Sequence, residues 1–188
     1  HPSTGHSSSS SVDPIVVPLP RRQPVIIRDV KPTDVAASNI REVFKEGIMT
    51  GDTDASGRPL GVFGGSDAVT YAQTAKIAVK IGELEPVLTG PILSRSARGE
   101  WSESYVRAAE RQGWQAFDRA VDANAHPSKK DVVQTLLDAA DIPYERKNRN
   151  GALLKAAELG LTSDTNKRAL TRRETAIILS RILKLPGK

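Results

Sequence analysis

The sequence predicts an all-α protein built from three helix-loop-helix repeats that pack around one core. A short box, in which a hydroxyl residue is followed three positions later by Gln, Asp or Glu, occurs three times. Each box opens a stretch with apolar residues at helical spacing. In a capping box the hydroxyl accepts a hydrogen bond from a backbone N–H, and the later side chain bonds back to the cap. Three such boxes indicate one unit written three times. The copies are Thr70-Tyr71-Ala72-Gln73, Ser128-Lys129-Lys130-Asp131 and Thr171-Arg172-Arg173-Glu174.

A second helix is expected ahead of each box, and a glycine ends it. Gly47, Gly113 and Gly160 each follow a helical pattern, as the left-handed residue after a helix does. Two-helix units of this length cannot bury their apolar faces alone, so the three units must pack together. The apolar residues expected on these three earlier helices are Ala37, Ile40, Val43 and Phe44, then Tyr105, Val106, Ala108 and Ala109, then Ala152, Leu153, Ala156 and Ala157.

The expected boundaries follow from these helices and from the composition between them. Residues 1–24 contain a serine run followed by Pro14, Pro18, Pro20 and Pro24, which predicts a disordered tail. Repeat 1 spans 28–81, a connector with two prolines spans 82–99, repeat 2 spans 100–140 and repeat 3 spans 142–185. Within repeat 1, Asp52, Asp54 and Gly57 form part of a calcium-loop pattern but lack the downstream Glu of an EF-hand. We therefore expect a turn there, and no metal site.

The composition limits the classes of protein and partner. Only 4% of the 188 residues are aromatic, so the core must be aliphatic, and the absence of cysteine excludes disulfides and thiolate metal sites. No apolar run approaches the roughly 20 residues that a membrane-spanning helix needs. The formal net charge of +5 favours an anionic partner, which leaves nucleic acid, anionic polysaccharide and lipid headgroups open.

The order of these motifs resembles the S-layer homology (SLH) family, whose domains come as three tandem repeats. Its repeats read Asp-Val near the start, then Gly-Ile-x-x-Gly, a Phe-containing loop and a Thr-Arg-Ala-Glu box. The resemblance covers about residues 28–185 and is weakest in the second repeat. The matching residues are Asp29-Val30, Gly47-Ile48-Met49-Thr50-Gly51, Phe63, the three boxes and Gly160-Leu161-Thr162-Ser163.

The resemblance implies a compact, pseudo-threefold α-helical module with long loops that anchors exported proteins to the bacterial cell wall. Family members bind secondary cell-wall polysaccharides, often pyruvylated, in grooves between repeats. The Arg of the box is a principal anion contact there, and its counterparts by position are Tyr71, Lys129 and Arg172. Tyr71 carries no charge, so the grooves at Lys129 and Arg172 are expected to keep their cation. The implied location is the cell surface, with S-layer or other exported domains attached.

The residues also support an anion site without the family. Lys129-Lys130 and Arg172-Arg173 stand at predicted helix N-termini, where the helix dipole repels cations and free N–H groups attract anions. An acidic ligand reverses that repulsion, and Arg binds a carboxylate through two parallel hydrogen bonds. The alternative is that these cations extend into solvent or pair with acids of the protein. The candidate ligand-binding residues are Arg172, Lys129, Thr171, Ser128, Arg173, Lys130, Tyr71 and Trp101.

Trp101 is a candidate because it stands just outside its helix and offers a sugar a flat apolar face. No nucleophile elbow, phosphate-binding glycine loop or paired-carboxylate site stands out, so we expect neither an enzyme nor a cofactor. Two other functions remain open. A basic helical array that binds nucleic acid explains the charge, although the basic residues are not gathered on one face. A protein–protein scaffold without a glycan ligand is the other.

Overall fold

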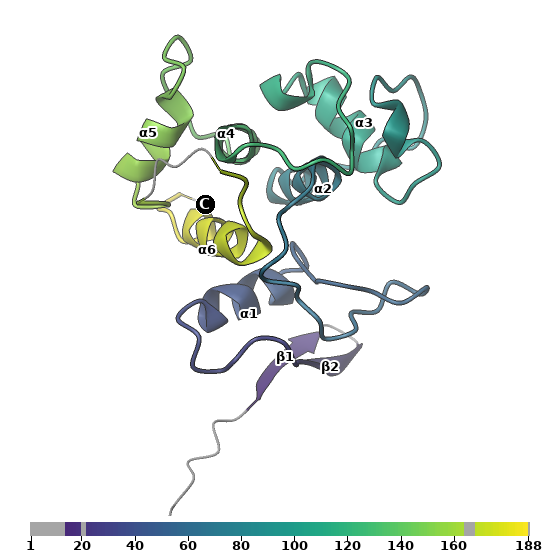
Figure 1. Ribbon diagram of the computed structural model, residues 1–188, viewed down its shortest axis with the longest axis vertical. Helices are drawn as coiled ribbons and strands as arrows, with labels where there is room; N and C mark the ends of the chain where they lie inside the picture. Colours follow the sequence, from purple (N-terminus) through teal and green to yellow (C-terminus); the bar gives the residue numbers. More distant parts are fainter. Residues whose placement is uncertain (1–13, 20–21, 164–167, 188) are drawn as a thin grey trace, which may run out of the picture.

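The computed structural model describes residues 14–19, 22–163 and 168–187. Within these residues the chain forms six α-helices, two short 3-10 helices and one two-stranded antiparallel sheet (Figure 1). The elements in chain order are β1 (Ile15–Leu19), β2 (Arg22–Ile27), α1 (Ala37–Lys45), α2 (Tyr71–Ile81), η1 (Arg95–Ala97), α3 (Glu103–Gln112), η2 (Gln115–Phe117), α4 (Lys129–Ala139), α5 (Gly151–Glu158) and α6 (Arg172–Leu183).

The sheet makes the all-α prediction wrong: the fold is mixed α/β, not an all-α repeat module. Strands β1 and β2 pair in antiparallel register, with Val16 opposite Ile26. That pair is exposed, whereas Ile15, Val17 and Ile27 are buried in the core with α1. The strands occupy part of the segment 1–24 that we expected to be a disordered tail, and residues 1–13 of that segment lie outside the described residues. Prolines are tolerated here because each strand of a two-stranded sheet has an outer edge.

The predicted starts of three helices are confirmed, and so is their capping. Thr70 and Thr171 form complete capping boxes at α2 and α6. Ser128 accepts from the N–H of Asp131 at 3.2 Å at the start of α4. The helices expected ahead of the boxes are α1, α3 and α5, and Gly47, Gly113 and Gly160 follow them with φ near +70°. These features are local, so the sequence alone predicts them.

The helices pair across the boundaries that the sequence suggested. Helix α3 packs on α2, α5 packs on α4, and α1 packs on α6, so each earlier helix covers a capped helix from a different predicted unit. Helices α2 and α4 also contact each other. In Figure 1, α6 lies between α1 and α4, which brings the two ends of the chain's helical part together. Each predicted unit therefore depends on helices of the other two to cover its apolar faces.

The loops ahead of the capped helices hold this arrangement together. The N–H of Arg172 donates to the carbonyl of Asp67, three residues before Thr70. The N–H of Tyr71 donates in the same way to the carbonyl of Ala125, three residues before Ser128. Isolated bridges join Ala68 to Thr171 and Ser128 to Ala169. The start of each capped helix is therefore bonded to the loop that leads into another.

Two clusters of buried side chains form the core, and α2 contributes to both. The larger cluster joins the hairpin, α1, α4, α5 and α6, with Phe44, Leu136 and Leu179 fully buried. The smaller one lies between α2 and α3 and is rich in alanine, with Trp114 and Phe117 supplying its volume. As expected from the composition, most of the core is aliphatic. No helix in the described ranges is long and apolar enough to cross a membrane.

Replacing a cap hydroxyl is expected to lower the stability measurably. Thr171→Ala removes the acceptor for the Glu174 N–H at 3.1 Å and should cost about 1 kcal/mol of unfolding free energy, as lost N-caps do elsewhere. Thr70→Ala and Ser128→Ala should behave alike. Urea denaturation of each variant measures the loss, with Thr89→Ala at an exposed loop position as the control. If the three cap variants unfolded at the same urea concentration as the control, the caps would contribute nothing to stability.

Candidate functional site

A cavity of about 450 Å³ opens between the loop after α1, the middle of α2 and the start of α6. Its walls combine cationic, polar and aromatic side chains from segments far apart in the sequence. The lining is therefore formed by tertiary packing, because no single segment supplies it. The lining residues are Ile48, Met49, Thr50, Gly51, Asp52, Thr53, Gln73, Lys76, Ile77, Trp101, Tyr105 and Arg172.

Arg172 is the most deeply placed charge in this cavity. Its residue is only 9% exposed, and its Nε is buried without a hydrogen-bond partner. The guanidinium lies 5.5 Å from the centre of the Phe63 ring, and no described carboxylate forms an ion pair with it. Burial lowers the pKa of Arg172, while Asp52, Asp67 and Asp29 act on that pKa in the opposite direction from a distance. A buried guanidinium with an unused donor favours an acidic oxygen from outside the chain.

Lys76, on α2, brings a second cation to the same cavity. Its ammonium lies 5.7 Å from the centre of the Trp101 ring, within the range of a cation–π contact. Burial lowers the pKa of Lys76, and the charges of Lys80 and Arg172 shift it in the same direction. Lys76 has no ion pair with any described residue. Two cations therefore share the cavity, and neither forms an ion pair with a described carboxylate.

Trp101 and Tyr105 form the aromatic wall. Trp101 is 58% exposed, and its ring centre lies 6.4 Å from that of Tyr105 at a tilt of 59°. Trp114 is buried and belongs to the core instead. An exposed indole beside cations is suited to stacking on a sugar ring, which presents an apolar face of its own.

The loop that forms the opposite wall is held by its own hydrogen bonds. Gly51 has a φ of +67°, and a Cβ there would lie 2.1 Å from the carbonyl oxygen of Val62, so only glycine fits. Asp54 accepts from the Ser56 N–H, the Ser56 hydroxyl and the Arg58 N–H at 2.6–3.0 Å. These bonds, the one from Ser56 above all, lower the pKa of Asp54. Asp54 thus forms the expected turn. Within 14–19, 22–163 and 168–187, no group of three His, Asp or Glu side chains is placed to hold a metal ion.

The expectation of free N–H groups at the helix starts of the two basic boxes is wrong for α6. At α6 the backbone N–H of Arg172 donates to the backbone carbonyl of Asp67, and that of Arg173 to the carbonyl of Gly65. The next N–H, that of Glu174, donates to the Thr171 hydroxyl. The first two N–H groups of α2 likewise donate to the carbonyls of Ala125 and Ala123. The neighbouring loop occupies the place where an anion would bind to the backbone. Any anion at these helices must be held by side chains.

Several candidate residues are engaged within the protein. Arg173 pairs with Asp34 through its Nε and Nη2, with a shortest distance of 2.7 Å, and this contact raises the pKa of Arg173. The hydroxyls of Thr171 and Ser128 serve as helix caps. Arg173 therefore follows the alternative in which a cation pairs with an acid of the protein. The side chains of Arg173, Thr171 and Ser128 do not line the cavity.

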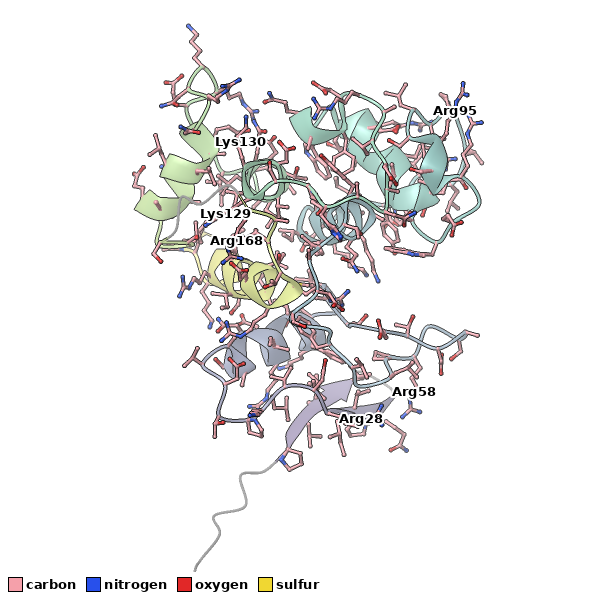
Figure 2. All side chains as sticks on the ribbon, viewed as in Figure 1. Arg28, Arg58, Arg95, Lys129, Lys130 and Arg168 are labelled. Atoms are coloured by element: carbon pink, nitrogen blue, oxygen red, sulfur yellow. The ribbon has the colours of Figure 1, made fainter. Side chains whose placement is uncertain are left out.

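Lys129 and Arg172 occupy the same position in their helices but not the same surroundings. Lys129 is only 2% exposed, and its Nζ donates to the Thr162 hydroxyl at 2.8 Å. In the view of Figure 2, Lys129 is drawn between α4 and α6. Its neighbour Lys130 is half-buried on the first turn of α4 and does not line the cavity. The expected likeness of Lys129 and Arg172 is therefore absent.

Tyr71 is packed against its own neighbours. Its ring meets Phe117 edge to face at 5.9 Å, and its hydroxyl lies 3.5 Å from the carboxylate of Asp131. Burial raises the pKa of Tyr71 and the charge of Asp131 raises it further, whereas Arg119 acts in the opposite direction. An acidic ligand at this hydroxyl would face that carboxylate. Of the eight candidate residues, the cavity brings together Arg172 and Trp101.

Sequence reasoning missed Lys76, Gln73 and Asp52 as lining residues. The Gly-Ile-Met-Thr-Gly segment 47–51 was noted as a motif, and its position next to the cavity gives it a role as a wall. Lys76 lies three residues after the end of its box, and nothing in the local pattern distinguishes it from a solvated lysine. No family model matches this chain, and no curated protein is significantly similar to it.

Proposed function

We propose that this chain is a non-catalytic module that binds an anionic polysaccharide of the bacterial cell wall through the cavity at Arg172. The observation that carries the proposal is the pair of cations without a direct ion pair to a described carboxylate, Arg172 and Lys76, beside the exposed ring of Trp101. A sugar that carries a carboxylate satisfies both features at once. The acid meets the guanidinium, and the apolar face of the sugar meets the indole.

The polar residues of the cavity add to this preference. Gln73, Thr50 and Asp52 offer hydrogen-bonding groups to sugar hydroxyls within reach of the two cations. Asp52 also keeps the cavity from being purely cationic, which disfavours a densely charged ligand such as duplex DNA. An acidic polysaccharide, with one charge per sugar or fewer, suits this balance better than a phosphate backbone does.

The resemblance to the SLH family supports the same conclusion. It implies the ligand class, a secondary cell-wall polysaccharide that often carries ketal-linked pyruvate, and a module at the cell surface that anchors an exported or S-layer protein. The helix pairs α1–α2, α3–α4 and α5–α6 fall within the predicted boundaries 28–81, 100–140 and 142–185. The proposal does not require the other two box positions to bind ligand.

The test compares binding to a pyruvylated cell-wall polysaccharide before and after mild acid removes its pyruvate. The parent protein should bind the intact polymer and lose most of its affinity for the treated one. Arg172→Ala should weaken binding to the intact polymer by roughly ten- to a hundredfold, because a charge-assisted contact contributes about 1.5–3 kcal/mol. Isothermal titration calorimetry measures both effects.

A matched control separates this contact from overall charge. Arg41→Ala removes one positive charge from an exposed site on α1 and should leave the affinity unchanged. Lys76→Met keeps most of the side-chain stem and should weaken binding in the same direction as Arg172→Ala. Equal affinity for the two forms of the polymer would rule out recognition of the acid. Tighter binding to duplex DNA than to the polymer would favour the nucleic-acid alternative.

A further inference from the structure

The three capped helices begin with three different residues at equivalent positions. The first residues of α2, α4 and α6 are Tyr71, Lys129 and Arg172. The structure makes these positions equivalent in more than sequence, because the starts of α2 and α6 are bonded to the next loop in the same register. What differs is whether the space in front of each is open.

At the start of α4 the space is filled from within. The ammonium of Lys129 is buried and donates to Thr162, a residue of the loop that follows α5. That loop corresponds to the segment after α1 that forms a wall of the cavity at Arg172. Lys129 thus bonds to the loop after α5, and a ligand could enter between them only if that bond were absent. Its burial leaves no face of the ammonium for a sugar acid to approach.

At the start of α2 the protein's own side chains span the corresponding space. Gln134, which stands in α4 where Lys76 stands in α2, donates from Nε2 to Oε1 of Gln115 at 2.6 Å. Gln115 belongs to the segment after α3, again the counterpart of the cavity wall. Tyr71 adds its edge-to-face contact with Phe117 and the nearby carboxylate of Asp131. The position has one nearby cation, Arg119, which acts on the Tyr71 hydroxyl, and the bonded pair Gln134 and Gln115 lies where Lys76 and the cavity wall lie at Arg172.

We infer that the protein binds one acidic sugar per chain, at Arg172, and that Lys129 and Tyr71 close the other two positions as structural contacts. The inference rests on the proposed function and adds its stoichiometry and the division of labour among the three positions. A long polymer then attaches at one point per module. Stronger attachment has to come from several modules on one polymer.

The test is a calorimetric titration of the full chain with a methyl hexoside that carries one ketal-linked pyruvate. We expect a stoichiometry of one. Arg172→Ala should remove the binding heat, whereas Tyr71→Phe and Lys129→Met should leave both stoichiometry and affinity within twofold of the parent. Tyr71→Phe keeps the ring and its contact with Phe117, so it remains informative if Lys129→Met fails to fold.

The outcomes separate this inference from the proposed function. A stoichiometry of two or three, or a tenfold loss of affinity in Tyr71→Phe or in a folded Lys129→Met, would overturn the single-site inference and leave polysaccharide binding standing. Binding that survives in Arg172→Ala at a stoichiometry of one would place the site elsewhere and overturn it too. The hexoside without pyruvate serves as the blank. An absence of heat with both hexosides and with the intact polymer would overturn the proposed function and this inference with it.

Discussion

A chain that ends at Ala140 is expected to lose the cooperative thermal transition of the full-length protein. The deletion removes α5 and α6, and these helices cover α4 and α1 respectively. Phe44 and Val43 on α1, and Leu136 and Leu137 on α4, are at most 1% exposed in the intact fold. Each such side chain contributes about 1.5–3 kcal/mol through burial, so uncovering these four removes about 6–12 kcal/mol, which is comparable to the roughly 5–15 kcal/mol by which a domain is stable.

The cyclic order of the helix pairs is the reason why so much is lost at once. In a linear array the first units would keep their own contacts after a C-terminal deletion. Here α1 packs on α6, so the deletion uncovers both the cut end and the beginning of the helical part. The remaining α2–α3 and α2–α4 contacts leave the larger core open on two sides.

Circular dichroism and calorimetric melting measure this prediction directly. The matched control ends at Leu185, which removes three residues after α6 and should melt like the parent. We expect the chain that ends at Ala140 to show a broad, low-enthalpy transition and to bind a hydrophobic dye. A sharp transition of the truncated chain, with an enthalpy in proportion to its length, would show that residues 1–140 fold on their own.

Local signals in the sequence predicted the capped helices. Features that depend on contacts between distant segments could not be predicted from it. The hydroxyl caps at 70, 128 and 171 act within one helical turn, so their positions are read correctly from the residues alone. The hairpin was missed because the prolines and serines of the segment 1–24 favour an extended tail. Its strand signal was the pair of short β-branched runs Ile15-Val16-Val17 and Val25-Ile26-Ile27.

The candidate site also depends on tertiary contacts that the sequence does not reveal. Lys129 and Arg172 have the same place in the same box, and the sequence offers no reason to separate them. The difference arises from Thr162, which lies 33 residues from Lys129 in the chain and bonds to it in the fold. Lys76 was missed for the converse reason. Its position in the second turn of a helix is ordinary, and only the packing of α3 brings Trp101 next to it.

The segment 82–99 also differs from the simple connector that its prolines suggested. The side chain of Arg107, on α3, is buried and fastens this segment to the helix. Its Nη1 donates to the carbonyl of Val87 at 2.7 Å and its Nε to that of Gly90 at 3.0 Å. Its Nη2 lies 3.1 Å from the carboxylate of Glu103. One guanidinium thus satisfies two backbone carbonyls and an acid at once.

Arg107→Met is therefore expected to cost about 3–5 kcal/mol of unfolding free energy. Two hydrogen bonds from a charged donor contribute about 1.5–3 kcal/mol each, and the variant leaves the carbonyls of Val87 and Gly90 without that donor. Methionine keeps part of the apolar volume, so the loss reports mainly on the polar contacts. Urea denaturation measures the effect.

Arg111→Met is the matched control for this prediction. Arg111 lies one turn further along α3 and donates to the carbonyl of Thr89 at 3.1 Å in the same segment, but its side chain is exposed. An exposed contact of this kind contributes less than about 1 kcal/mol. The two variants remove the same charge from the same helix, so the difference between them isolates the burial of Arg107. Equal losses would mean that the segment 82–99 is held by its apolar contacts alone, because the buried guanidinium would then contribute no more than the exposed one.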